Sequence, residues 1–295
     1  MKAGLDMTSG RKRNGKRLVL AIAVAAVCLS GFIYWQNNHL VTTAIRYVHP
    51  GLPDSFDDFT IVHVSDLHNK SFGANQNRLV RATERASPDL IVITGDLIDS
   101  KRTDIDAAMN YIKQAAAMAP TYYVTGNHEK WSGVYAELSE RLLGAGVVLM
   151  DDRRIELAKD GGTIDLLGLK DPAFTPSVND RELERKLVAL RPSQSDSLTL
   201  LLSHRPEKLQ LYANAGIDLV FAGHAHGGQF RIPFVGGLIA PDQGLFPRYT
   251  SGLHTEGHTS MIVSRGLGNS IIPVRIWNRP ELVVVTLGKE EPAAK

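Results

Sequence analysis

Carboxylate, imidazole and amide side chains recur in five short segments of this 295-residue chain, each directly after a run of apolar residues. The segments are Asp-Leu-His at 66–68, Gly-Asp at 95–96, Gly-Asn-His-Glu at 126–129, a single histidine at 204, and Gly-His-Ala-His-Gly at 223–227. Such a mixture of oxygen and nitrogen donors suits Mn²⁺, Fe or Zn²⁺ better than Ca²⁺ or Cu⁺. The pattern therefore predicts a metal centre, with candidate ligands Asp66, His68, Asp96, Asn127, His204, His224 and His226.

The number of candidate ligands indicates two metal ions. Seven side chains are too many for one tetrahedral ion, whereas two ions that share a bridging carboxylate would use them all. Two ions about 3.5–4 Å apart can clamp the attacking and leaving oxygens of a phosphoryl displacement and lower the pKa of a bound water. Glycines beside the candidate ligands allow the tight turns and close backbone approach that such a site needs: Gly95, Gly126, Gly223 and Gly227.

Apolar strands and amphipathic helices alternate from residue 59 onward, and this alternation predicts an α/β domain with helices covering the sheets. Expected strands cover 59–64, 89–94, 121–125, 147–149, 163–169, 198–202, 219–222, 259–264 and 281–287. Expected helices cover 75–86, 103–117, 134–143, 179–190 and 206–215. The candidate ligands follow strands in the same sense, so we expect them to meet at one edge of the fold, where open α/β sheets build their sites.

Taken together, in this order and in this strand context, the five motifs resemble those of the calcineurin-like metallophosphoesterase superfamily, over about residues 59 to 287. The resemblance implies a four-layer αββα sandwich, with two mixed sheets flanked by helices, and a metal-dependent phosphoesterase. It also implies one ion on Asp66, His68, Asp96 and His226, and a second ion on Asn127, His204, His224 and the bridging Asp96.

His128 is similar to the superfamily's non-ligand histidine, which contacts phosphate and protonates the leaving group. The expected catalytic residues are accordingly His128, Asp96 and Asn127. Residues 223–253 and 264–285 carry a narrower similarity to the branch of bacterial YkuE- and YaeI-like phosphodiesterase proteins, which is related to UDP-2,3-diacylglucosamine hydrolases.

The expected function is hydrolysis of a phosphodiester, with a lipid-linked substrate such as a UDP-2,3-diacylglucosamine-like compound as the candidate. A phosphomonoesterase or nucleotidase is one alternative. An inactive metal-binding membrane scaffold is another, which the complete set of candidate ligands and His128 disfavours.

Residues 18–35 form an uninterrupted apolar run that, as a helix of about 27 Å, would cross a bilayer core. A basic segment at 1–17 precedes the run and aromatic residues close it, so the positive-inside rule predicts a cytoplasmic N-terminus and an extracytoplasmic catalytic domain in a single-pass cell-membrane protein. A signal peptide removed on export is the alternative, although no convincing small-x-small cleavage site follows the run. The remaining boundaries expected are a linker at 36–57, a catalytic domain at 58–288 and a tail at 289–295.

Charge and cysteine content limit the remaining partners. The net charge is +2 and the positive excess lies before residue 18, so the domain itself is slightly acidic, which argues against nucleic acid. The one cysteine, Cys28, lies in the apolar run, so no disulfide forms within the chain. No protein partner is evident.

Weaker candidates surround the main motifs. His63 lies inside a strand and is expected in the core, whereas His254 and His258 are candidates for substrate contact, and Arg265 for phosphate contact. Residues 230–249 are rich in apolar side chains, which predicts either a packed hairpin or an exposed apolar lip facing the membrane.

Overall fold

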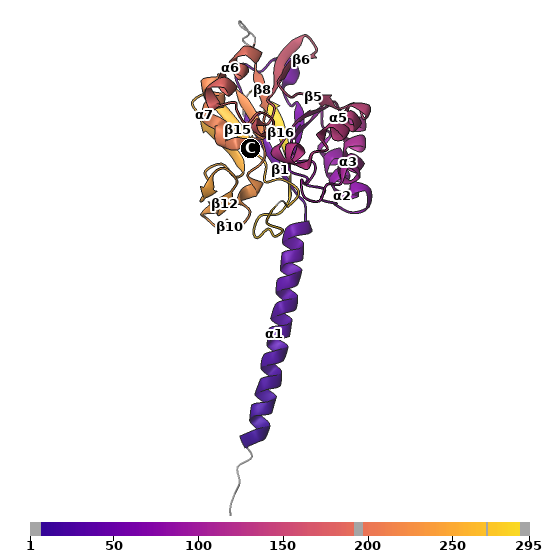
Figure 1. The fold of residues 1–295 in the computed structure, drawn as a ribbon, viewed down its shortest axis with the longest axis vertical. Coiled ribbons are helices and arrows are strands. Elements are labelled where there is room, and N and C mark those ends of the chain that lie inside the picture. The colour runs from indigo at the N-terminus through magenta and orange to yellow at the C-terminus, as the bar shows by residue number, and fades with distance from the viewer. Residues whose placement is uncertain (1–6, 192–196, 270, 290–295) are drawn as a thin grey trace, which may run out of the picture.

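The computed structural model describes residues 7–191, 197–269 and 271–289, and it consists of two facing six-stranded sheets preceded by one long helix (Figure 1). The first sheet has the order β1 (Val41–Val48), β16 (Glu281–Gly288), β2 (Thr60–Val64), β3 (Leu90–Thr94), β4 (Thr121–Val124) and β5 (Val148–Leu149). The second has the order β14 (Gly252–Glu256), β15 (Thr259–Val263), β9 (Leu219–Ala222), β8 (Thr199–Leu202), β7 (Gly162–Gly168) and β6 (Arg153–Lys159).

Both sheets are mixed. Strands β2 to β5 run parallel, as do β7, β8, β9 and β15, while β16, β6 and β14 add antiparallel neighbours. The central strands β3, β8 and β9 are buried at every position because both of their faces are covered, which explains their continuous apolar sequences.

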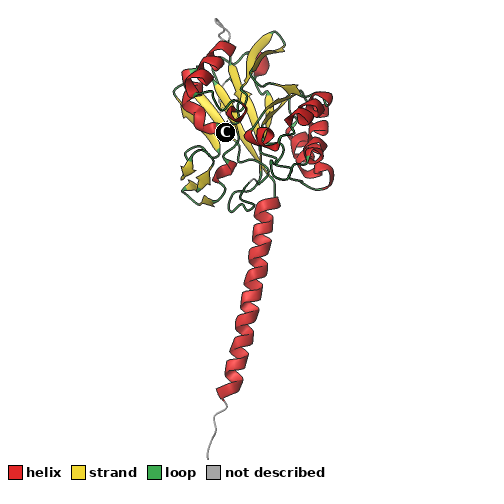
Figure 2. Cartoon of the chain, in the orientation of Figure 1, coloured by secondary structure: helices red, strands yellow, loops and turns green. Residues whose placement is uncertain are grey.

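Helices cover the outer face of each sheet, as Figure 2 shows. One side carries α2 (Asn77–Ala86), α3 (Ile105–Met118) and α5 (Tyr135–Gly144), and the other carries α6 (Asp180–Leu190) and α7 (Leu209–Asn214). A third apolar cluster fills the space between the sheets, with members such as Val92, Leu200 and Phe221. The predicted four-layer sandwich is confirmed.

Several short elements complete the domain, and most of them lie in the loops. Helix α4 (Asn127–Ser132) follows β4, and the late loops hold the two-stranded pairs β10 (Arg231–Ile232) with β11 (Gly236–Gly237) and β12 (Ile239–Ala240) with β13 (Gly244–Leu245). Turns of 3-10 helix cover Asp54–Phe56, Ala74–Gln76, Pro172–Phe174, Pro206–Lys208 and His226–Gly228. The helix expected at 206–215 is therefore a 3-10 turn followed by α7.

The expected linker at 36–57 is wrong in its central part, because Val41–Val48 forms strand β1 and pairs in parallel with β16 along its full length. The strand was not predicted because Thr42, Thr43 and Arg46 interrupt its apolar residues and its partner lies at the other end of the chain. Strands β6 and β14 were also not expected. Each is a half-exposed outer strand paired through an antiparallel hairpin, and such strands need few apolar residues.

Helix α1 (Met7–Asn38) contains one candidate membrane span, Lys16–Asn38, with none of its most apolar window buried in the rest of the protein. The last turn is different, because Gln36 and Asn37 are buried against the domain. Asn37 Oδ1 accepts a hydrogen bond from the Arg275 backbone N–H at 2.9 Å, and the Arg78 guanidinium donates to the Asn38 carbonyl at 3.2 Å. Lys70 donates to the Asn37 carbonyl, so the domain satisfies the last two carbonyls of the helix.

Candidate metal centre

The candidate ligands all come from the ends of parallel strands, as the sequence predicts. Asp66 and His68 follow β2, Asp96 follows β3, and Asn127 opens α4 after β4. The second sheet supplies His204 after β8, and His224 and His226 after β9. The two sheets therefore contribute from opposite sides to one buried group, in which every candidate ligand is at most 6% exposed.

One half of this group consists of Asp66, His68, Asp96 and His226. His68 Nε2 lies 3.2 Å from His226 Nε2 and 3.5 Å from Asp96 Oδ2. His226 Nε2 lies 3.4 Å from Asp66 Oδ1. Metal–ligand bonds of about 2.0–2.2 Å place neighbouring donor atoms roughly 3 to 3.5 Å apart, so these four side chains are arranged as an ion would require.

The other half gathers around His204. Its Nε2 lies 3.2 Å from Asp96 Oδ2, 3.2 Å from Asn127 Oδ1 and 3.2 Å from His224 Nδ1. Asp96, His204 and His224 could hold a metal ion together. Asp96 Oδ2 thus approaches donors of both halves, which is the position of a shared ligand.

The backbone at these residues is strained. Five candidate ligands have left-handed φ angles between 45° and 65°, a region that non-glycine residues seldom occupy; they are Asp66, His68, Asp96, His224 and His226. Local hydrogen bonds hold this conformation, since His128 N–H donates to Asp96 Oδ1 at 2.8 Å and His224 N–H donates to Asp66 Oδ2 at 3.1 Å.

Two glycines make room for the aspartates. A Cβ atom on Gly126 would clash with Asp96 Oδ1, and one on Gly223 would lie 2.5 Å from Asp66 Oδ2. The expectation that glycines beside the ligands permit close approach is confirmed at these positions.

Hydrogen bonds to the ring nitrogens indicate which nitrogen faces the centre. His204 Nδ1 lies 2.7 Å from the Thr94 carbonyl, which accepts its proton and leaves the Nε2 lone pair for the centre. His128 Nδ1 instead accepts a hydrogen bond from Ser100 N–H at 3.0 Å, so its proton resides on Nε2. His204 has the tautomer of a ligand, and His128 has the tautomer that donates a hydrogen bond from Nε2.

Electrostatics couple Asp96 and His204. Burial disfavours both charges, yet their mutual attraction raises the pKa of His204 to about 10 and holds the pKa of Asp96 well below its usual range. Burial lowers the pKa of His226 to about 3, which keeps that imidazole neutral. A divalent ion would displace the proton on His204, so binding is expected to release protons.

Four residues around the centre were missed by the sequence reasoning. Glu129 is fully buried and accepts hydrogen bonds from the backbone N–H groups of Asp96, Leu97 and Gly126 at 2.8–2.9 Å, which fixes the turn that presents Asp96. Burial and the nearby Asp96 carboxylate raise the pKa of Glu129 to about 7. Asp99 Oδ2 lies 3.9 Å from the Nδ1 atoms of both His68 and His128.

Asp242 and Arg275 contact His224 and His226 through the ring nitrogens that face away from the metal centre. Asp242 Oδ2 lies 2.9 Å from His224 Nε2, so the carboxylate orients the ring whose Nδ1 faces the centre. Arg275 is fully buried and places its guanidinium 3.4 Å from His226 Nδ1. A carboxylate three residues after Asp96 was a signal that could have identified Asp99, whereas the long loops that carry Asp242 and Arg275 have no periodicity to read.

The weaker candidates lie elsewhere. His63 is buried in the core, as expected, and pairs with Thr94 Oγ1 at 2.8 Å. His254 lies on the edge strand β14 with its Nε2 3.1 Å from the Ser251 carbonyl, and Arg265 is paired with Glu281 at 2.7 Å. His258 lies in the turn between β14 and β15. The structure brings none of these four residues into the candidate metal groups.

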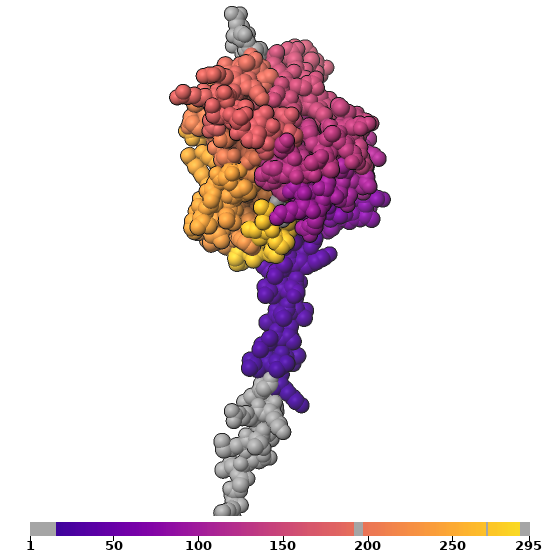
Figure 3. Space-filling view, viewed as in Figure 1, coloured from indigo at the N-terminus to yellow at the C-terminus, as the bar shows by residue number. Residues whose placement is uncertain are grey.

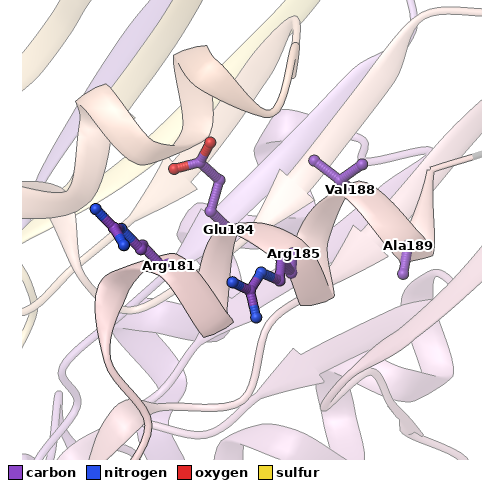
Figure 4. Close-up of a pocket in the computed structure, with 5 residues that line it drawn as sticks. All are labelled: Arg181, Glu184, Arg185, Val188 and Ala189. Carbon is purple, nitrogen blue, oxygen red and sulfur yellow. The ribbon is translucent and has the colours of Figure 1, made fainter.

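Two hollows open beside the centre and share Trp131. One, of about 300 Å³, is lined by His128, Asp99 and Lys101 among others, and the second, of about 510 Å³, reaches Arg205 and Asp242. A further hollow of about 330 Å³ runs along α6 and contains no candidate ligand (Figure 4).

Residues 59–228 of the chain match the calcineurin-like phosphoesterase family. The chain belongs to this family. The metallophosphoesterase YkuE of Bacillus subtilis is 29% identical over 288 residues, which cover 94% of this chain and 97% of that protein. Phosphodiesterase YaeI of Escherichia coli is 26% identical over 293 residues, with coverage of 92% and 98%.

A transmembrane protein with a metallophosphoesterase domain from Bos taurus is 29% identical over 287 residues, which cover 92% of this chain and 62% of that protein. Family membership and the buried histidine–aspartate group together identify a metal-dependent phosphoester hydrolase with a divalent metal centre.

Proposed function

We propose that the enzyme binds two divalent ions and hydrolyses phosphodiesters at a membrane surface. One ion would be held by Asp66, His68, Asp96 and His226, and the other by Asp96, Asn127, His204 and His224. The observation that carries this assignment is the position of Asp96 Oδ2, which lies 3.5 Å from His68 Nε2 and 3.2 Å from His204 Nε2.

The donor set fits Mn²⁺, Fe or Zn²⁺, because both positions combine imidazole nitrogens with carboxylate or amide oxygens. Two such ions, when bound, supply Lewis acidity and neutralise the charge that develops on the transferred phosphoryl group. The chain's own residues fix the geometry: Glu129 holds the Asp96 turn, Thr94 orients His204, and Asp242 orients His224.

His128 is proposed as the general acid. Its Nδ1 accepts a hydrogen bond from the Ser100 N–H, so the proton of the neutral ring lies on Nε2, the nitrogen that would face the leaving oxygen. Burial lowers the pKa of His128 and so favours the neutral ring. The negative charge of a bound phosphate would favour the protonated ring, which is the form that gives up a proton as a general acid.

A diester substrate is supported by the full-length similarity to phosphodiesterase YaeI. The apolar α1 helix supports a single-pass anchor, and the basic residues before it support an extracytoplasmic domain. A lipid-linked phosphodiester, such as a UDP-2,3-diacylglucosamine-like compound, would suit an active site held at this surface.

The first test is hydrolysis of bis-p-nitrophenyl phosphate and p-nitrophenyl phosphate by the full chain in detergent with Mn²⁺, together with metal analysis. We expect two ions per chain and faster turnover of the diester. Faster turnover of the monoester would replace the proposal by a phosphomonoesterase or nucleotidase. Absence of turnover in a metal-loaded protein would favour the scaffold.

A further inference from the structure

Exposed apolar side chains lie beside the end of α1 that joins the domain. We call this surface the apolar rim, and it consists of exposed side chains on two segments: Ile232, Phe234, Val235, Ile271 and Trp277. Phe234 is fully exposed, and Trp277 remains 57% exposed although it is a large aromatic residue. Trp277 and the turn between β10 and β11 line one hollow of about 440 Å³, so the two segments form one surface.

This rim is continuous with the membrane helix. The Phe32 ring of α1 packs edge-on against Trp277 with ring centroids 6.3 Å apart, and the Arg279 guanidinium lies 4.7 Å from the centre of the Trp35 ring. Figures 1 and 3 show β10 and the 271–279 segment at the end of the domain from which α1 emerges, while α6 lies at the opposite end. Aromatic and arginine side chains at the end of an apolar span are typical of the bilayer interface.

The connection between α1 and the domain is too short for the domain to lie away from the bilayer. Helix α1 ends at Asn38 and β1 begins at Val41, so only His39 and Leu40 intervene. Because Gln36 and Asn37 are buried against the domain, the helix is also fixed in direction.

The backbone of the rim adds a second observation. Phe234 and Trp277 have φ angles of 67° and 49°, a region in which bulky residues are outliers. Glycine or asparagine would adopt this conformation at lower cost, so the aromatic side chains are retained against a local penalty.

The rim also borders the active site. Ile271 lines the hollow beside His128, and the exposed Lys101 and Arg102 line the same hollow. Cationic side chains close to a bilayer attract anionic headgroups.

We propose that the apolar rim lies in the headgroup layer of the bilayer that α1 spans, so that the hollow beside His128 opens at the bilayer surface and receives an anionic lipid-borne phosphodiester directly from it. This inference rests on the proposed membrane anchor and phosphodiesterase activity. It adds a second membrane contact, made by the catalytic domain itself.

The contact is tested with the full chain in vesicles of phosphatidylcholine and phosphatidylglycerol. In a Cys28→Ser background, an environment-sensitive fluorophore is attached at Phe234→Cys or, as control, at Val188→Cys. Val188 is 52% exposed on α6 at the far end of the domain. Spin-labelled lipids are expected to quench the label at position 234 and not the label at position 188.

Equal quenching at the two positions would overturn the proposal. A label at 234 that is shielded from water but not quenched by lipid would also overturn it, because a second protein copy would then cover the rim.

The functional arm compares two substrates with the same leaving group, bis-p-nitrophenyl phosphate in solution and a p-nitrophenyl phosphatidyl diester in vesicles. Phe234→Ser is expected to lower turnover of the lipid diester roughly tenfold, the effect of losing one buried aromatic contact, with the soluble diester unchanged. Val188→Ser should alter neither. Equal loss on both substrates contradicts the rim proposal, whereas a wild-type chain inactive on both refutes the proposed function and leaves the quenching result valid.

Discussion

The metal centre and the apolar rim both hold non-glycine residues in left-handed backbone conformations, but they treat these residues in opposite ways. At the centre the strained residues are aspartates and histidines, which tolerate this conformation comparatively well, and hydrogen bonds such as His128 N–H to Asp96 hold them. At the rim they are Phe234 and Trp277, and their side chains point outward. Hydrogen bonds within the protein hold the residues of the centre, whereas at the rim Trp277 is contacted by the Phe32 ring and Phe234 is fully exposed.

The largest expected effect comes from removing the shared carboxylate. Asp96→Asn keeps the size of the side chain but removes the charge that both halves of the centre share, so turnover of bis-p-nitrophenyl phosphate should fall at least about 10³-fold. Metal content measured on the purified protein should fall with it. Turnover like that of the wild type would show that the centre is not organised around Asp96.

His128→Ala should lower turnover of the same diester roughly 10²-fold while both ions remain bound, because the histidine donates a proton and binds no metal. The loss should be greater for an alkyl diester, whose leaving oxygen needs the proton more. His254→Ala is the matched control, since His254 lies on the edge strand β14. Loss of metal from the His128 variant would instead make it a ligand.

Asp242→Asn should weaken the affinity for one of two ions about tenfold, because the carboxylate orients His224 from behind. Titration of the apoprotein with Mn²⁺ followed by calorimetry would show one weakened step. Asp180→Asn, which removes a surface carboxylate paired with Lys208, is the control and should leave both steps unchanged. Equal weakening of both metal-binding steps would contradict a role of Asp242 at one ion only.

The smallest expected effect is a gain in stability rather than a loss of activity or metal affinity. Phe234→Asn in detergent should raise the free energy of unfolding by about 1 kcal/mol, because asparagine accepts the left-handed conformation that phenylalanine resists. For a domain of this size that corresponds to a Tm increase of roughly 2–4 °C. Val188→Asn on α6 should not raise Tm, and a lower Tm for Phe234→Asn would mean that the rim is held by contacts within the protein.

The metal centre and the apolar rim also differ in how far the sequence predicts them. Asp66, Asp96 and His204 were predictable because polar residues directly after buried strands have few structural reasons to be there. Helix α4 and strand β1 were not predictable, since α4 has only six residues, beginning at Asn127, and β1 depends on pairing with β16 at the far end of the chain.

Longer loops escaped prediction for a different reason. Asp242 and Arg275 act through contacts that only the folded chain creates, and neither lies in a periodic segment. The sequence predicts either a packed hairpin or an exposed apolar lip at 230–249, and the structure shows features of both: Gly237 and Ala240 are buried, whereas Phe234, Leu245 and Phe246 are exposed. The sequence of a turn does not show whether its apolar side chains pack inward or point outward.

With the proposed membrane anchor, the two-residue connection between α1 and β1 has a kinetic consequence. An enzyme on a long tether samples the solution around its anchor, but a domain seated directly on its membrane helix searches only by lateral diffusion in the plane. Its rate would then follow the number of substrate molecules per unit area of membrane, and diluting the substrate with inert lipid would slow it even when the amount of substrate in the tube is constant.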